Sequence, residues 1–328
     1  MRCSSFVTVE AAVRTDSAAT GFVPSAMALS AGLIWSLGAL TARLARHSDA
    51  WQYLIWRSIG IVVVIELFAA RRRSFGGSEP RTTMLRRAYT SGRVMTVACV
   101  CLLTASLGFV YAIKNTTAAN AAFLSSVTPL VAVVVARPVL GERLTAVTVG
   151  AIAVAFGGLA IMVTADVGVG NMRGNIAALL SSVGFAGYTV CVRSGPTRDW
   201  SPVLPGYASM IIVLCGAVCV ANGRTVLPPA RDIGWALLHG SVLIVVGTLL
   251  FNRGSRHLPA VAMTVYAQTE TVFVPLWIYL RFNEQPKTTT LIGGAVILAS
   301  VLGKAVLDSR PTPGTRLVLG EPGPGTIA

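Results

Sequence analysis

The sequence predicts an all-α integral membrane protein with ten transmembrane helices, arranged as two inverted-topology repeats of five helices. The first observation is composition: 54% of the 328 residues are hydrophobic and only 12% are charged, whereas a soluble domain carries about 25% charged residues. The second is a series of ten apolar runs, each long enough to cross a hydrocarbon core about 30 Å thick. The third is a set of features that recurs between the two halves of the chain.

The ten predicted helices follow one another with short loops between them. The least separated pair is 94–113 and 116–136, which only Lys114 and Asn115 divide. Together these runs are too long for one crossing, so we expect two helices joined by a tight turn. The predicted spans, in order, are 22–42, 51–70, 94–113, 116–136, 145–165, 174–192, 203–221, 234–252, 259–280 and 288–307.

Both ends of the chain are predicted to lie outside the membrane. Residues 1–21 are polar and mixed and lack the long apolar core of a signal peptide, so we expect a tail followed by an uncleaved first helix. Residues 308–328 are rich in Pro and Gly, which predicts a disordered tail.

The basic residues predict the orientation. The net charge of +14 does not indicate nucleic-acid binding, because the arginines lie in short loops and form no basic patch interleaved with aromatic residues. With ten spans, one side of the membrane receives 18 of the 27 Lys and Arg residues and the other side eight, while Arg57 falls within a span. The positive-inside rule therefore predicts that both termini are cytoplasmic and that the protein lies in the inner or plasma membrane.

The sequence contains no motif for enzymatic or metal chemistry. Neither a Walker A phosphate loop nor HExxH occurs, and the three His residues are scattered. The cysteines lack the His or carboxylate neighbours of a metal site. We therefore expect no enzyme activity, no cofactor and no metal.

An internal repeat divides the chain into the modules 22–165 and 166–307. The stretch 28–43 aligns with 178–193 at an offset of 150, which matches Trp35 with Phe185. A second offset, of 142, matches Glu142 with Glu284, each just after one apolar helix and before another; these acids are expected to be structural anchors. Five spans per module would make the second copy enter the membrane from the opposite side, as in the inverted repeats of many secondary transporters.

Glu270 is the acid nearest the middle of any predicted span. At helical spacing it shares one face with large side chains, namely Met263, Tyr266, Phe273 and Trp277. Because a carboxylate at mid-membrane depth costs at least about 2.5 kcal/mol, we expect it to face protein or water rather than lipid. Two interpretations stay open: Glu270 exchanges a proton as a cavity opens to each side, or it is a structural acid bonded to Ser, Thr or Arg57.

The sequence resembles the drug/metabolite transporter superfamily, specifically its EamA-type members with two five-helix modules. The resemblance rests on the paired segments 129–142 and 270–284, on Arg57 and on the repeated first helices. It implies a secondary transporter that exports small metabolites or drugs, commonly with proton coupling. Second-half relatives often have Pro after the acid of the ninth helix, whereas Thr271 follows Glu270 here and Pro275 comes later, so any helix break is expected to be displaced by one turn.

Other polar and aromatic residues within spans are weaker candidates. Arg57 lies seven residues into its span and is interpreted either as snorkelling to the interface or as the counter-charge of an acid or anionic substrate. Glu66, beside the basic 71–93 loop, is interpreted as an interfacial ion-pair partner. The other candidates for substrate or proton contact are Asn120, Thr128, Trp35, Tyr188 and Tyr266, with Ser125 and Ser126 beside them.

These observations favour alternating-access transport of a small molecule over a non-transporting structural or regulatory membrane subunit, and they leave coupling to protons open. An aromatic cavity with one acid suits cationic or zwitterionic amphiphiles, but it would also accept neutral metabolites. The partners predicted are therefore the lipid bilayer and a small-molecule substrate, without nucleic acid, while the oligomeric state stays open.

Overall fold

The fold is entirely helical in the part of the chain that the structure describes. This computed structural model describes residues 4–74, 82–116, 121, 124–125, 127–141, 145–163, 172–282 and 288–308, and no strand occurs in these ranges. The predicted anchors Glu142 and Glu284 and the candidates Asn120 and Ser126 lie outside the described residues.

The helices follow the predicted spans closely. The first half contains α1 (Ser4–Leu44), α2 (Ala50–Ser74), α3 (Met84–Thr90), α4 (Arg93–Asn115), α6 (Thr128–Leu140) and α7 (Ala146–Val163). The second half contains α8 (Met172–Ser194), α9 (Val203–Ala221), α10 (Ala230–Leu238), the π-helical turn η1 (His239–Ile244), α11 (Val245–Gly254), α12 (Ala260–Ala267), α13 (Thr269–Phe282) and α14 (Thr288–Asp308).

Six helical segments among the described residues are long and apolar enough to cross a membrane. They are Val23–Leu44, Ala50–Ser74, Arg93–Asn115, Met172–Ser194, Val203–Ala221 and Ala230–Gly254. Two shorter apolar helices accompany them, Thr128–Leu140 and Ala146–Gly158.

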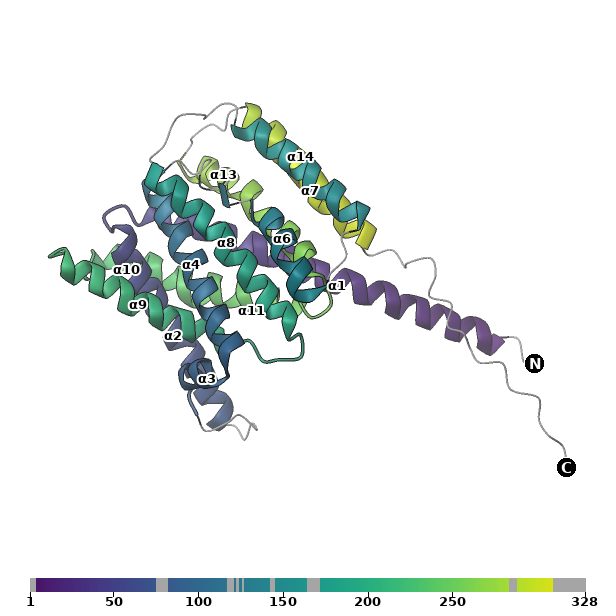
Figure 1. The fold of residues 1–328 in the computed structure, drawn as a ribbon, viewed down its shortest axis with the longest axis horizontal. Helices are drawn as coiled ribbons and strands as arrows, with labels where there is room; N and C mark the ends of the chain where they lie inside the picture. Colours follow the sequence, from purple (N-terminus) through teal and green to yellow (C-terminus); the bar gives the residue numbers. More distant parts are fainter. Residues whose placement is uncertain are drawn as a thin grey trace.

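The start of the first helix differs from the predicted one. Helix α1 begins at Ser4 rather than near residue 22, although its membrane-length apolar part begins at Val23, and its N-terminal part extends away from the other helices (Figure 1). Helix α4 ends at Asn115, two residues after the predicted end at 113. The described helix α6 begins at Thr128, and most of 117–126 lies outside the described residues, so the predicted start of the helix 116–136 is not tested. Pro129 lies in the first turn of α6, where its missing N–H has no helical partner to lose.

Pairs of helices from the two halves hold the bundle together. Helix α8 packs against α4 and α6, while α1 packs against α11 and α13. Helix α2 packs against α9, and α7 packs along α14, a pair that Figure 1 shows side by side at one edge of the molecule. Every one of these contacts joins the first half to the second, so neither half buries its inner helix faces without the other.

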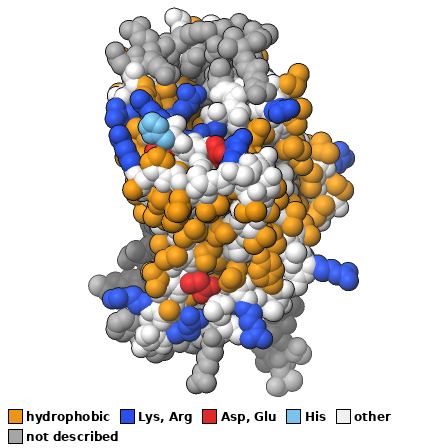
Figure 2. Space-filling model, turned by 90° about the vertical axis from the view of Figure 1, so that its left-hand side faces the viewer, with side chains coloured by type: hydrophobic (Ala, Val, Ile, Leu, Met, Phe, Trp, Pro, Cys, Tyr) orange, Lys and Arg blue, Asp and Glu red, His pale blue; other side chains and the backbone are white. Residues whose placement is uncertain are grey.

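Polar contacts connect the loops at two ends of the bundle. At one end, Arg224 and Asp49 form an ion pair at 2.8 Å, and the Asp232 carboxylate accepts the backbone N–H of Ser48 at 2.7 Å. At the other end, Arg87 and Asp199 form an ion pair at 3.0 Å. Figure 2 shows a band of hydrophobic side chains between two zones that carry the Lys and Arg residues, as expected for a membrane-spanning protein.

The short helix α3, which contains Arg87, has two side-chain contacts at its N-terminus. The Thr83 hydroxyl caps its N-terminus by accepting the N–H of Arg86. The Glu66 carboxylate accepts the N–H of Leu85 at 2.7 Å, so this acid stabilises a helix start, which favours negative charge.

Candidate functional site

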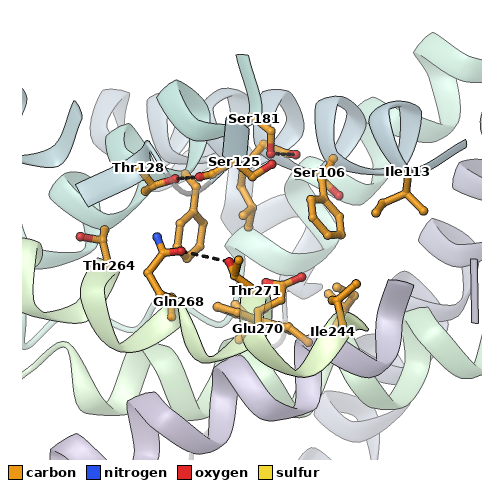
Figure 3. A pocket seen from close by; sticks show the side chains of 18 of the residues that line it. Ser106, Ile113, Ser125, Thr128, Ser181, Ile244, Thr264, Gln268, Glu270 and Thr271 are labelled. Atoms are coloured by element: carbon orange, nitrogen blue, oxygen red, sulfur yellow. Dashed lines mark hydrogen bonds between the residues drawn. The ribbon is translucent and has the colours of Figure 1, made fainter. Parts of the chain in front are cut away.

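A cavity of about 130 Å³ lies inside the bundle, between the two halves. Its walls come from α1, α2, α4 and α6 of the first half and from α8, α9, η1, α11, α12 and α13 of the second. The residues that carry its polar chemistry are Arg57, Ser106, Ser125, Thr128, Ser181, Tyr207, His239, Thr248, Thr264, Gln268, Glu270 and Thr271. Figure 3 shows Thr128, Ser125 and Ser181 on one side, facing Gln268, Thr271 and Glu270 on the other.

A helix break positions Glu270 on the cavity wall. Helix α12 ends at Ala267 and α13 begins at Thr269, so the predicted continuous helix 259–280 is interrupted at Gln268. The Thr269 hydroxyl competes with helical hydrogen bonding here, because it donates to the Tyr266 backbone carbonyl at 2.8 Å. The Thr271 hydroxyl donates to the side-chain oxygen Oε1 of Gln268 at 3.0 Å, which ties Gln268 to the start of α13. The break therefore precedes Glu270, and the prediction that it is displaced to Pro275, which lies inside α13, is wrong.

The break also changes which side chains lie beside Glu270. Tyr266 is fully buried in α12 and is not among the residues that line the cavity, whereas Glu270 is. The helix between Tyr266 and Glu270 is therefore interrupted, and of these two predicted site residues only Glu270 lines the cavity. On the C-terminal side, Phe273 and Trp277 remain stacked at 5.9 Å, and the Trp277 indole donates to Ser36 Oγ at 2.8 Å.

The Glu270 carboxylate has no bonding partner in the described part of the chain. It is partly buried and lines the cavity, yet it makes neither a hydrogen bond nor an ion pair there. In particular it is not paired with Arg57, which was the structural interpretation of this acid. Its charge state can therefore respond to the contents of the cavity rather than to a fixed protein partner.

Thr128 lines the opposite wall of the cavity, and its side chain is bonded to a neighbouring residue of the same segment. Its hydroxyl donates to the Ser125 carbonyl at 2.6 Å, and the Ser125 hydroxyl itself is buried without a partner among the described residues. Across the helix interface, the Ser182 hydroxyl donates to the Leu124 carbonyl at 2.7 Å. This wall thus offers hydroxyl groups but no charge.

Arg57 also lines the cavity, deep inside the protein. Arg57 is 2% exposed, so its side chain does not extend to the membrane interface, and the interpretation that it snorkels there is wrong. Nη2 donates to Ser106 Oγ, while Nε is buried without a hydrogen-bond partner among the described residues.

Aromatic rings form the apolar part of the wall. Trp35 meets Phe185 edge-on at 5.5 Å and Phe251 at 5.3 Å between ring centroids. Trp35 lines the cavity, and its Nε1 is a buried donor without a partner in the described ranges. Tyr188 lies in the core behind this wall instead, because its hydroxyl donates to Asn252 Oδ1.

Sequence reasoning missed His239. The turn η1 has π-helical geometry, which often occurs at functional sites, and it presents His239 to the cavity. The Tyr53 hydroxyl donates to Thr41 at 3.0 Å and lies 2.8 Å from His239 Nδ1, so this network assigns the proton to Nδ1 and leaves Nε2 as an acceptor. The available signal was an ionisable residue inside the predicted span 234–252.

The position of η1 depends on one close approach. A Cβ atom at Gly240 would collide with the backbone carbonyl of Arg57, so only glycine lets η1 pack this tightly on α2. This contact brings His239 and Arg57 to the same side of the cavity. No group of three or more His, Cys, Asp or Glu residues that could hold a metal occurs in the described ranges.

Comparison with known proteins decides the family. A family model for EamA-like transporters matches the chain twice, over residues 24–164 and 172–304. The chain belongs to the EamA-like transporter family. It is therefore a multi-pass membrane transporter, with a small-molecule substrate and a lipid environment.

Individual relatives of this EamA-family protein agree with that assignment. The pseudopaline exporter CntI from two strains of Pseudomonas aeruginosa is 26% and 25% identical over 195 residues, which cover 59% of this chain and 68% of the exporter. A solved crystal structure with 18% identity superposes with a TM-score of 0.69 and covers 87% of this chain and 97% of the other, so the two share a fold.

Proposed function

We propose that this EamA-family protein is a secondary exporter of small molecules that works by alternating access between two five-helix modules, with Glu270 as the proton-exchanging acid. The observation that carries the proposal is the unpaired Glu270 carboxylate on the wall of a cavity to which both halves contribute. An ionisable residue inside a membrane protein is costly unless it has a function or a partner.

The two-module arrangement has two supports. The family model matches residues 24–164 and 172–304, close to the predicted modules 22–165 and 166–307. The helix contacts are also reciprocal: α1 packs against α11 and α13 of the second half, and α8 packs against α4 and α6 of the first. Contacts of this kind are expected of two repeats related by a pseudo-two-fold axis, with the binding site between them.

In the proposed cycle, the modules rock about the cavity so that it opens to one side of the membrane at a time. Glu270 takes a proton from one side of the membrane and releases it to the other. The solute and the proton thus move through the same cavity in one cycle. The exporter relatives from Pseudomonas aeruginosa favour outward movement of the solute. The excess of basic residues in alternate loops favours cytoplasmic termini in the inner membrane.

The test uses the full chain reconstituted into proteoliposomes and a panel of amino acids, nucleobases and lipophilic cations. For any solute that the wild type moves, we expect flux to follow an imposed pH gradient and Glu270→Gln to remove that dependence. Glu66→Gln is the matched control, since Glu66 is an acid of a membrane helix that bonds to Leu85 and is not among the cavity-lining residues. Equal pH dependence in wild type and Glu270→Gln would remove this acid from the mechanism.

A further inference from the structure

The cavity contains a buried positive charge that the protein does not neutralise. Among the described residues that line the cavity, Arg57 is the single Lys or Arg, and it is 2% exposed. It forms no ion pair within the described ranges, and its Nε donor has no hydrogen-bond partner there. A buried charge without a partner is costly, so a site of this kind favours a bound counter-ion.

Two other basic residues within membrane helices show what a structural role looks like in this protein. The Lys114 ammonium donates to the carbonyls of Ala45 and Ser48. Arg193 Nη1 lies within hydrogen-bond distance of two carbonyls, those of Ser255 at 3.4 Å and Arg256 at 3.1 Å. Both are thus tied to backbone oxygens, and neither lines the cavity. Arg57 differs from both, since its hydrogen-bond partner among the described residues is the Ser106 hydroxyl and not a backbone carbonyl.

The surroundings of Arg57 indicate a single negative charge on the ligand. The indole Nε1 of Trp35 is a second donor on the cavity wall that is buried and unpaired among the described residues. No second Lys or Arg lies beside Arg57 among the described lining residues, so a bound dianion such as phosphate would keep excess negative charge. A guanidinium matches a carboxylate with two parallel hydrogen bonds, which suits one planar monoanion.

We propose that Arg57 is the anion subsite of the cavity and that the transported solute carries a carboxylate group, which the Arg57 guanidinium binds. The proposal rests on the proposed function, since it assumes that the solute occupies this cavity. It narrows the substrate class that sequence composition suggested: a solute with only cationic groups would leave Arg57 unpaired. Glu270, which is not paired with Arg57, stays available for proton exchange.

The test is equilibrium binding to the purified full chain, which needs no transport. The probes are benzoate, 3-phenylpropionate and L-phenylalanine, each with its own amide, and the readout is the dissociation constant from thermal-stability titrations. We expect the wild type to bind at least one acid about 10- to 100-fold more tightly than its amide, the range for a hydrogen-bonded charged group. Arg57→Gln should remove this preference.

Two further variants keep the result interpretable. Arg193→Gln removes a guanidinium outside the cavity and should retain the preference for the acid. Arg57→Lys keeps the positive charge but loses the bidentate geometry of the guanidinium, so its preference for the acid over the amide should be reduced but not lost. This variant replaces Arg57→Gln in the test if Arg57→Gln does not fold. Equal binding of acids and amides by the wild type, no acid-dependent stabilisation of the wild type, or an unchanged preference in Arg57→Gln would each overturn the subsite.

The outcomes separate this proposal from the proposed function. A preference for acids that depends on Arg57, together with flux that ignores the pH gradient, would retain the anion subsite and reject proton coupling through Glu270. Flux that follows the pH gradient through Glu270, without any preference for acids over amides, would retain proton coupling and reject the anion subsite.

Discussion

Two segments at matching places in the two halves, 124–140 and 266–282, meet the cavity from opposite sides but differ in chemistry. At the offset of 142 that aligns them, Thr128 corresponds to Glu270. The Thr128 hydroxyl is bonded to the Ser125 carbonyl, while the Glu270 carboxylate is unbonded in the described part of the chain. Related backbone positions thus carry a fixed hydroxyl in one half and a free acid in the other.

The helices that pack on these two segments repeat the difference. At the offset of 150, Gly32 of α1 corresponds to Ser182 of α8. An added Cβ atom at Gly32 would lie 3.1 Å from the Ala267 carbonyl oxygen and 3.2 Å from Thr269 Cβ, so this helix approaches the break beside Glu270 closely. Ser182 instead donates a hydrogen bond to Leu124, just before Thr128. The segment with the acid thus packs closely against the backbone of α1, and the segment with the hydroxyl is hydrogen-bonded to α8.

The largest effect is expected from making the two segments alike. Glu270→Thr puts the chemistry of the first half into the second, and no carboxylate then remains among the described residues that line the cavity. We expect pH-driven flux in proteoliposomes to fall to the background of empty vesicles, because the variant removes the proposed proton-exchanging acid. Flux that still follows the pH gradient would mean that proton exchange occurs elsewhere.

The next effect is expected at the close approach beside the break. Gly32→Leu would push α1 away from Ala267 and Thr269, and overpacking of this kind costs about 1–3 kcal/mol. We expect lower thermal stability in detergent and lower flux together. Gly216→Leu is the control, since nothing lies within 4 Å of an added Cβ atom there; equal losses in both variants would contradict specific packing at the break.

A smaller effect is expected at the corresponding position in the other half. Ser182→Ala removes the hydrogen bond to Leu124, and such interhelical bonds contribute about 0.6 kcal/mol in membrane proteins. Thermal stability should fall slightly, with the pH dependence of flux unchanged. A loss of coupling as large as that of Glu270→Thr would show that both halves take part in proton exchange.

The smallest effect is expected from Thr128→Val. The Ser182 hydroxyl, which donates to the Leu124 carbonyl, also lies 3.1 Å from the Ser125 carbonyl and can share its hydrogen with it, so the net cost of losing the Thr128 hydroxyl should be no more than about 0.5 kcal/mol. Solute affinity, measured by the same titrations, should change less than about threefold. A larger loss of affinity would indicate that the Thr128 hydroxyl contacts the solute directly.

The sequence predicts the elements of this fold better than the cavity. Apolar runs of the length that a membrane crossing needs define helices such as Val203–Ala221, whose bounds match the prediction. Glu270 could be found because a charge is rare in such runs. The break at Gln268 could not be predicted, because it depends on local side-chain bonds: the Thr269 hydroxyl donates to the Tyr266 backbone carbonyl, and the Thr271 hydroxyl donates to the Gln268 side chain.

The depth at which a side chain is buried in the bundle is a second property that the sequence did not predict. Arg57 lies near the start of its helix, and sequence position alone favoured an interfacial site, but packing of α2 against α9 and η1 buries it. His239 reaches the cavity through a π-helical turn, whose geometry depends on Gly240 packing against the Arg57 backbone. Both facts are tertiary, so no pattern of hydrophobic residues contains them.

The most direct test of Glu270 as the coupling acid is the proton movement that accompanies solute movement. A pH-sensitive dye inside the proteoliposomes records protons while a labelled solute is added outside, without any imposed pH gradient. We predict that the wild type moves protons in a fixed ratio to solute and that Glu270→Gln moves solute down its gradient without protons. The same ratio of protons to solute in Glu270→Gln would contradict the assignment.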